Sequence, residues 1–147
     1  MKSLLERLRQ VARLAPAERV ILAEAWGLFL LVGLGLRILS FSRLLALCQP
    51  ASRSKPRDSA PPLPASLPRL AWLVEVAGRY APGKASCLEQ ALVVAWLLRR
   101  RGVATRLRIG VARQDGRLQA HAWVELDRGV TLGVLEDQGY EPLLPAR

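Results

Sequence analysis

The stretch SCLEQALVVAWLLRRRG, residues 86–102, predicts a helix whose two ends are both marked in the sequence. Ser86 suits the N-cap, and Glu89 three residues later can complete a capping box with it. Apolar residues recur at helical spacing at positions 88, 91, 92, 95 and 96. Three arginines fall in the last turn, where cations favour the helix dipole, and Gly102 suits the position after the C-cap.

Directly after this helix the apolar period changes to two, which predicts strands. We expect a first strand around residues 106–111, a hairpin turn at 114–117, a second strand at 118–126, a further turn at 127–129 and a third strand at 130–135. Helices followed by an antiparallel meander give an α+β fold, with the cysteine-bearing helix packed on an antiparallel sheet.

The chain divides by composition into three parts. Residues 1–48 form an N-terminal helical segment, whose longest helix is expected from Pro16 to about Leu39 because proline suits a first turn. Residues 49–66 contain five prolines and four serines and predict a linker. Residues 67–147 form the second unit, which opens with an expected helix from Leu67 to Tyr80.

The N-terminal segment contains an apolar run, VILAEAWGLFLLVGLGL at residues 20–36, which is 17 residues long with one charge, Glu24. A helix of that length is roughly 25 Å long, short of the ~30 Å hydrocarbon core of a membrane. We therefore expect a buried or membrane-touching helix rather than a span. The protein is expected to be cytoplasmic, with membrane association left open.

The composition limits partners and cofactors. The chain of 147 residues carries 22 basic and 12 acidic residues, and its net charge of +10 would attract an acidic peptide, a membrane surface or nucleic acid. No nucleic-acid-binding motif accompanies this charge, so we expect no nucleic acid partner. Cys48 and Cys87 lack metal-binding spacing and the chain has one histidine, so we expect free thiols, no metal and no organic cofactor.

Cys87 and His121 are the candidate catalytic pair. Cys87 opens the predicted helix, where unpaired backbone N–H groups and the positive end of the dipole stabilise a thiolate and can hold an oxyanion. His121 lies on the second strand, in the row of Trp123 that is opposite the apolar row. If that row meets the helix start, the imidazole can take the thiol proton and later protonate a leaving amine. Both residues are also common as structural residues.

Two stretches carry a family resemblance. CLEQALVVAWLLRRRGVATRLRIGV at 87–111 and AHAWVELD at 120–127 resemble the leader peptidase of lasso-peptide biosynthesis, within the transglutaminase-like, papain-type cysteine protease superfamily. The similarity is densest from about Arg69 to Leu144. We see no separate precursor-recognition domain, so we expect the split form, in which another small protein binds the leader.

The resemblance implies a Cys–His–Asp peptidase that cleaves the leader from a lasso-peptide precursor and needs no cofactor. It implies Cys87 as nucleophile and His121 as general base and acid. Its implied partners are the precursor peptide, a leader-binding protein and the lasso cyclase. The arginines between residues 99 and 117 could dock an acidic leader or its carrier, or could be a solvated helix end and strand face.

The third member of the triad is the open assignment. Family members place an acid on the strand after the histidine strand, where this sequence has Leu132-Gly133. Asp137 is preferred because the end of a neighbouring strand can reach a histidine ring, and the alternatives are Glu136, Asp127 and Glu125. Because Leu132-Gly133 stands where the family has an acid, a second hypothesis remains. In this hypothesis the protein is a non-catalytic basic scaffold that binds the precursor, its leader-binding partner and the cyclase.

Overall fold

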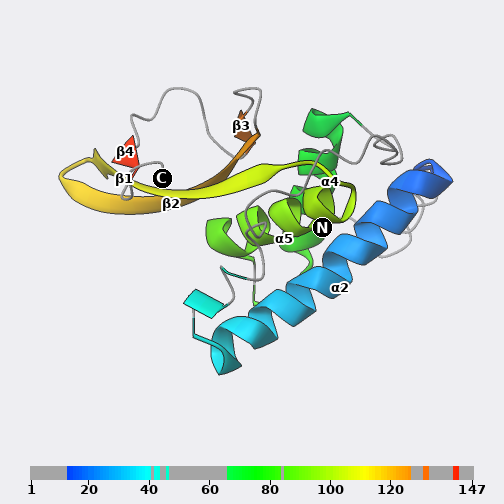
Figure 1. The fold of residues 1–147 in the computed structure, drawn as a ribbon, viewed down its shortest axis with the longest axis horizontal. Helices are drawn as coiled ribbons and strands as arrows, with labels where there is room; N and C mark the ends of the chain where they lie inside the picture. Colours follow the sequence, from blue (N-terminus) through cyan, green and yellow to red (C-terminus); the bar gives the residue numbers. More distant parts are fainter. Residues whose placement is uncertain are drawn as a thin grey trace, which may run out of the picture.

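The computed structural model describes residues 13–40, 42, 43, 46, 66–83, 85–126, 131, 132, 141 and 142. Its main elements, in chain order, are the helices α2 (Pro16–Ile38), α4 (Leu67–Arg79) and α5 (Cys87–Arg100), followed by the strands β1 (Thr105–Gln114), β2 (Arg117–Leu126), β3 (Thr131–Leu132) and β4 (Glu141–Pro142). Figure 1 shows α5 lying under the sheet, with α2 on its other side. The predicted α+β class is confirmed.

Helix α5 begins and ends as its sequence predicts. At its start, the Glu89 N–H donates to Ser86 Oγ (3.3 Å) and the Ser86 N–H donates to Glu89 Oε2 (2.6 Å), which completes the capping box. At its end, Gly102 has a φ of 74°, a conformation that costs glycine least. The N–H groups of Gly102 and Val103 donate to the carbonyls of Arg99 (2.9 Å) and Leu98 (3.0 Å), the two bonds of a Schellman motif.

Between these ends α5 is buried around its whole circumference. A helix that is apolar on every side must be covered on every side, and here the sheet covers one flank while α2 and α4 cover the others. Its buried residues are Ala91, Leu92, Val93, Val94, Ala95, Leu97 and Leu98.

The sheet is built around one long hairpin. β1 and β2 pair over their full lengths, and the two-residue loop has positive φ at both Asp115 (50°) and Gly116 (76°), as a type I′ turn requires. The strand order is β3-β2-β1-β4. Of the predicted third strand, residues 131 and 132 are described as β3 and the rest lie outside the described residues. The short β4, which pairs with β1, was not predicted.

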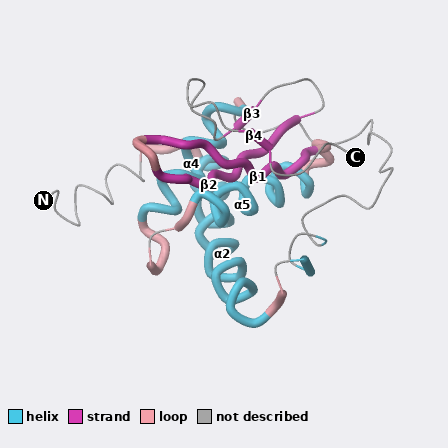
Figure 2. The backbone as a smooth tube through the Cα atoms, turned by 90° about the vertical axis from the view of Figure 1, so that its left-hand side faces the viewer, coloured by secondary structure: helices cyan, strands magenta, loops and turns pink. Residues whose placement is uncertain are grey.

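The helix that precedes the predicted linker shares its core with the elements that follow it. Ile21, Leu28 and Phe29 of α2 belong to the same buried cluster as Leu73 of α4 and Leu92 of α5. Figure 2 shows α2 as the helix farthest from the sheet, against α4 and α5. Residues 49–65 lie outside the described residues, so the boundaries at 48 and 66 stay predictions.

Helix α2 matches the helix that the sequence predicts from Pro16 to about Leu39. At 23 residues it is, among the described helices, long and apolar enough to cross a membrane. That property is compatible both with membrane association and with a soluble protein, since core helices share it. Within an 18-residue window of α2, 28% of the residues are buried inside this fold.

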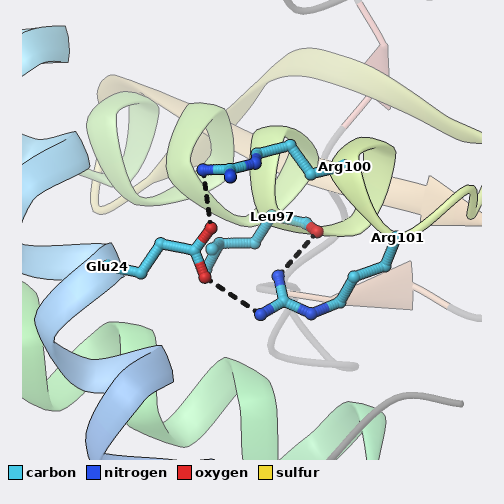
Figure 3. Close-up of polar contacts among 4 residues, drawn as sticks. All are labelled: Glu24, Leu97, Arg100 and Arg101. Atoms are coloured by element: carbon cyan, nitrogen blue, oxygen red, sulfur yellow. Dashed lines mark hydrogen bonds and ion pairs between the residues drawn. The ribbon is translucent and has the colours of Figure 1, made fainter. Parts of the chain in front are cut away.

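A single carboxylate joins α2 to the end of α5 (Figure 3). Glu24 accepts Arg100 Nη1 at 2.8 Å on one oxygen and Arg101 Nη2 at 3.0 Å on the other. Arg101 Nη1 also donates to the Leu97 carbonyl at 2.9 Å, one of the last carbonyls of α5. The charge that interrupts the apolar run of α2 therefore has a structural reason, because it neutralises cations at the C-terminus of the central helix.

Removing this carboxylate should destabilise the fold by about 1–3 kcal/mol. In Glu24→Gln, the side chain of Arg101, only 14% exposed, would lose its counter-charge while staying largely buried. The matched control is Glu75→Gln, which removes a pair with Arg79 whose side chains are 48% and 69% exposed, and should cost less than about 0.5 kcal/mol. Urea unfolding of the full chain measures both variants. Equal losses would show that the Glu24 cluster contributes no more than a surface ion pair.

Candidate active site

Cys87 is the first residue of α5, and its thiol is free and half-buried. Two N–H groups in the first turn of the helix already have acceptors. The Glu89 N–H donates to Ser86 Oγ, and the Gln90 N–H donates to the Ser86 carbonyl at 3.0 Å. The predicted position of Cys87 at a helix N-terminus is confirmed. Cys48 lies outside the described residues.

The loop that leads into Cys87 is held from both sides. The Gly78 carbonyl, near the end of α4, accepts the N–H groups of Ala81 (3.3 Å) and Ala85 (3.2 Å). From the other side, Gln90 Nε2 donates to the Ala85 carbonyl at 3.3 Å. A Cβ on Gly78 would lie 3.1 Å from the Phe29 ring and 3.2 Å from the Ala85 Cβ, so α2, α4 and this loop meet at a point where only glycine fits without displacement.

This anchoring of the loop was not predicted from the sequence. A glycine one residue before the end of a helix is a weak signal by itself, because it can mark close packing or only the helix end. The bond from Gln90 to Ala85 joins residues five positions apart, and the sequence gives no motif that predicts it.

His121 lies on β2, an element that packs against α5, but in the row that alternates with the helix-facing one. Ala122 and Val124 belong to the core cluster shared with α5. Successive side chains of a strand point to opposite faces, so His121 and Trp123 belong to the other row. Cys87 and His121 are thus placed on neighbouring elements and in different layers. Their pairing stays a prediction.

Glu125, one of the four candidate acids, has other partners. Its Oε2 accepts Arg108 Nε at 2.8 Å and its Oε1 accepts Trp123 Nε1 at 3.3 Å. Four residues along a strand also separate it from His121 by about 13 Å. The carboxylate therefore positions the buried Trp123 and pairs with Arg108 across the hairpin, which leaves it poorly suited to orient the histidine ring.

The other candidate acids, Asp127, Glu136 and Asp137, lie outside the described residues. Within the described part of the chain, no group of three His, Cys, Asp or Glu side chains gathers in a way that could hold a metal ion.

Six of the seven arginines between residues 99 and 117 fall into two groups. Arg100, Arg101 and Arg108 pair with carboxylates of this chain. Arg106, Arg113 and Arg117 are exposed on the hairpin. The arginines of the first group have a structural role, since they neutralise carboxylates of the same chain. Those of the second group are exposed and could contact a partner.

One ion pair has a resolved electrostatic effect. Arg69 Nε of α4 bonds Glu18 Oε1 of α2 at 2.7 Å, and this hydrogen bond holds the pKa of Glu18 below its ordinary value. The same bond raises the pKa of Arg69. Arg69 also stacks on the Trp72 ring, 4.3 Å from its centroid. The group ties α2 to α4 away from Cys87.

Comparison with known proteins places the fold in a family. No curated protein and no solved structure matches the chain. The family model of the transglutaminase-like superfamily matches residues 28–145, a span that starts within α2 and includes both Cys87 and His121. This superfamily includes cysteine proteases. With most of its length covered by the match, the chain belongs to the transglutaminase-like superfamily.

Proposed function

We propose that this protein is a cysteine peptidase that removes the leader peptide from a lasso-peptide precursor. The observation that carries the proposal is the free thiol of Cys87 at the first residue of α5, in a chain of the transglutaminase-like superfamily. The finer assignment, a leader peptidase of the split form, rests on the resemblance of residues 87–111 and 120–127.

The chemistry uses a helix start and an imidazole. His121 takes the proton of the Cys87 thiol, and the thiolate sulfur attacks the scissile carbonyl carbon. His121 then gives that proton to the leaving amine, and water hydrolyses the resulting thioester to release the leader acid and regenerate the thiol. Because Ser86 uses the N–H groups of Glu89 and Gln90, those of Cys87 and Leu88 are the candidates to stabilise the oxyanion.

The position of Cys87 at the end of α5 limits how the pair can form. A residue along the body of the helix would face Ala122 and Val124, the helix-facing row of β2. A residue at the helix end is not enclosed in this way, so this end is where a side chain of the other row could approach. We infer that His121 meets the thiol at this end of the helix.

The described strand register favours Asp137 as the acid that orients His121. β3 pairs with β2 so that Thr131 is opposite Glu125, in the row of His121. The expected third strand ends at residue 135; if its alternation ran two residues further, position 137 would share this row and position 136 would not. A diagonal neighbour on the adjacent strand is within reach of a histidine ring.

The partners follow from charge and from the resemblance. Arg106 and Arg117 are exposed in the same row of the hairpin as His121, and Arg113 is exposed in the other row. We propose that these cations attract an acidic leader or the leader-binding protein that carries it, and that the lasso cyclase is a further partner.

A second candidate function is a scaffold that binds the same partners without cleaving. The observation in its favour is the placement of His121 in the row that faces away from the helices. The two functions differ in whether the thiol reacts.

Loss of the nucleophile should abolish processing. Cys87→Ala should leave no cleavage of the precursor in the presence of its leader-binding partner, and His121→Gln should lower kcat by about 10²–10⁴-fold, since general acid–base catalysis is worth that much. Cys48→Ala, which removes the other thiol, should cleave like the wild type. Mass spectrometry of the products gives the rates. Undiminished cleavage by both site variants would exclude the peptidase.

A second readout needs no precursor. In the Cys48→Ala background, iodoacetamide should alkylate Cys87 at neutral pH, and His121→Gln should slow this alkylation about tenfold or more if the imidazole takes the thiol proton. Equal alkylation rates, together with tight binding of the partner and no cleavage by the wild type, would favour the scaffold.

The third triad position can be tested separately. Asp137→Asn should lower kcat by about tenfold or more because an unoriented imidazole adopts the wrong tautomer part of the time, while substrate binding is retained. The matched amide substitutions Glu136→Gln and Asp127→Asn should leave kcat unchanged. Whichever of the three variants alone loses activity identifies the acid, and loss only in Glu136→Gln would contradict the register argument.

A further inference from the structure

Helix α2 is apolar on both of its sides, yet this fold covers only one. The inward side carries the buried residues Ile21, Ala25, Leu28, Phe29 and Val32. The outward side carries Val20 (64% exposed), Leu31 (65%), Leu34 (55%) and Ile38 (72%). With Gly27, these positions recur at intervals of three, four and seven, so they share one face of the helix. We call this set the outer face.

The outer face is a continuous apolar surface. A Cβ built on Gly27 has nothing within 4 Å, so the middle of the face is open as well as its ends. In an ordinary soluble helix these positions carry polar or charged side chains. Contiguous apolar patches of this kind mark places where a protein meets another apolar phase or partner.

No acidic residue of α2 lies on the outer face. Glu18 and Glu24 are turned toward the fold, where they pair with Arg69 and with the arginines at the end of α5. The remaining charged residues of the helix are Arg19 near its start and Arg37 near its end. The outer face is therefore bracketed by cations.

The neighbouring sequence extends this basic character. Residues 37–57 contain five basic residues and no acid, and residues 2–13 contain four basic residues and one acid. Basic segments next to an apolar helix are attracted by anionic headgroups, at about 1 kcal/mol for each lysine or arginine near the surface.

Aromatic side chains of intermediate polarity lie at one edge of α2. Trp26 is 43% exposed and Tyr80 is 56% exposed. They are neighbours, because Trp26 Nε1 donates to the Tyr80 carbonyl at 3.2 Å. Tryptophan and tyrosine are the residues enriched where apolar and aqueous phases meet.

We propose that the outer face of α2 docks on an anionic lipid surface, with the helix lying in the plane of the interface. A membrane span is disfavoured because the inward side is packed on α4 and α5 and holds two ion-paired carboxylates. A second copy is disfavoured because face-to-face pairing in either direction brings arginines of one helix end against those of another. The proposal goes beyond the peptidase function and does not depend on it.

The test is flotation of the full chain with vesicles of phosphatidylcholine containing phosphatidylglycerol, beside vesicles of phosphatidylcholine alone. The protein should float with the anionic vesicles, and salt should weaken its binding. The double variant Leu31→Glu/Leu34→Glu should bind about tenfold or more weakly, because it places carboxylates in the contact face. Leu118→Glu, at an equally exposed leucine of the hairpin (70%), is the matched control and should bind like the wild type.

Several results would overturn the proposal. Two of them are failure of the wild type to float and equal binding to both vesicle types. Binding that salt does not weaken, as for an integral membrane protein, or unchanged binding of the double variant would also contradict it. Dimerisation of the lipid-free wild type that the double variant abolishes, measured by light scattering, would assign the face to a second copy instead. Unchanged thermal unfolding checks that the double variant folds. Cys87→Ala should float like the wild type, so failure of the peptidase function and of lipid docking can be told apart.

Discussion

The enclosure of α5 is the constraint on which the rest of the structure depends. A helix buried around its whole circumference needs a sheet on one flank and helices on the others, which is the arrangement that the chain forms. Its ends also need partners, because the first N–H groups and the last carbonyls of a helix have none within the helix. The capping box at Ser86, the Schellman motif at Gly102 and the Glu24–Arg101 pair provide this, and together they place Cys87 at one end and the start of the hairpin at the other.

Two helices of similar apolar character meet different surroundings here. α5 is covered on all sides, whereas α2 is covered on one, although its composition would suit burial on both. The difference lies in position: α2 is the helix farthest from the sheet, so nothing in the described fold packs on its outer side. Its two carboxylates show the asymmetry most directly, because both are used on the inward side. The outer side therefore keeps an apolar surface with basic ends.

Local patterns predicted the parts of this fold that local interactions determine. The ends of α5 and the turn at Asp115-Gly116 depend on residues a few positions apart, and each formed as the sequence indicates. The Glu24–Arg101 pair joins residues 77 positions apart, and no periodicity could reveal it. The same limit applies to His121: alternation identified its row, but only the packing of Ala122 and Val124 decides which row meets the helices. For β4, two residues including a proline give no strand pattern to detect.

The capping box that places Cys87 also limits how the thiol can be activated. Glu89 carries its negative charge in the first turn of α5, with Oε2 2.6 Å from the Ser86 nitrogen. This carboxylate stabilises the helix, but it offsets part of the positive potential that the dipole would otherwise offer to a thiolate. In the proposed mechanism, activation of Cys87 would therefore depend more on a base that removes the proton and keeps a positive charge nearby. His121 is the single histidine of the chain, so that mechanism requires its ring to reach the helix end.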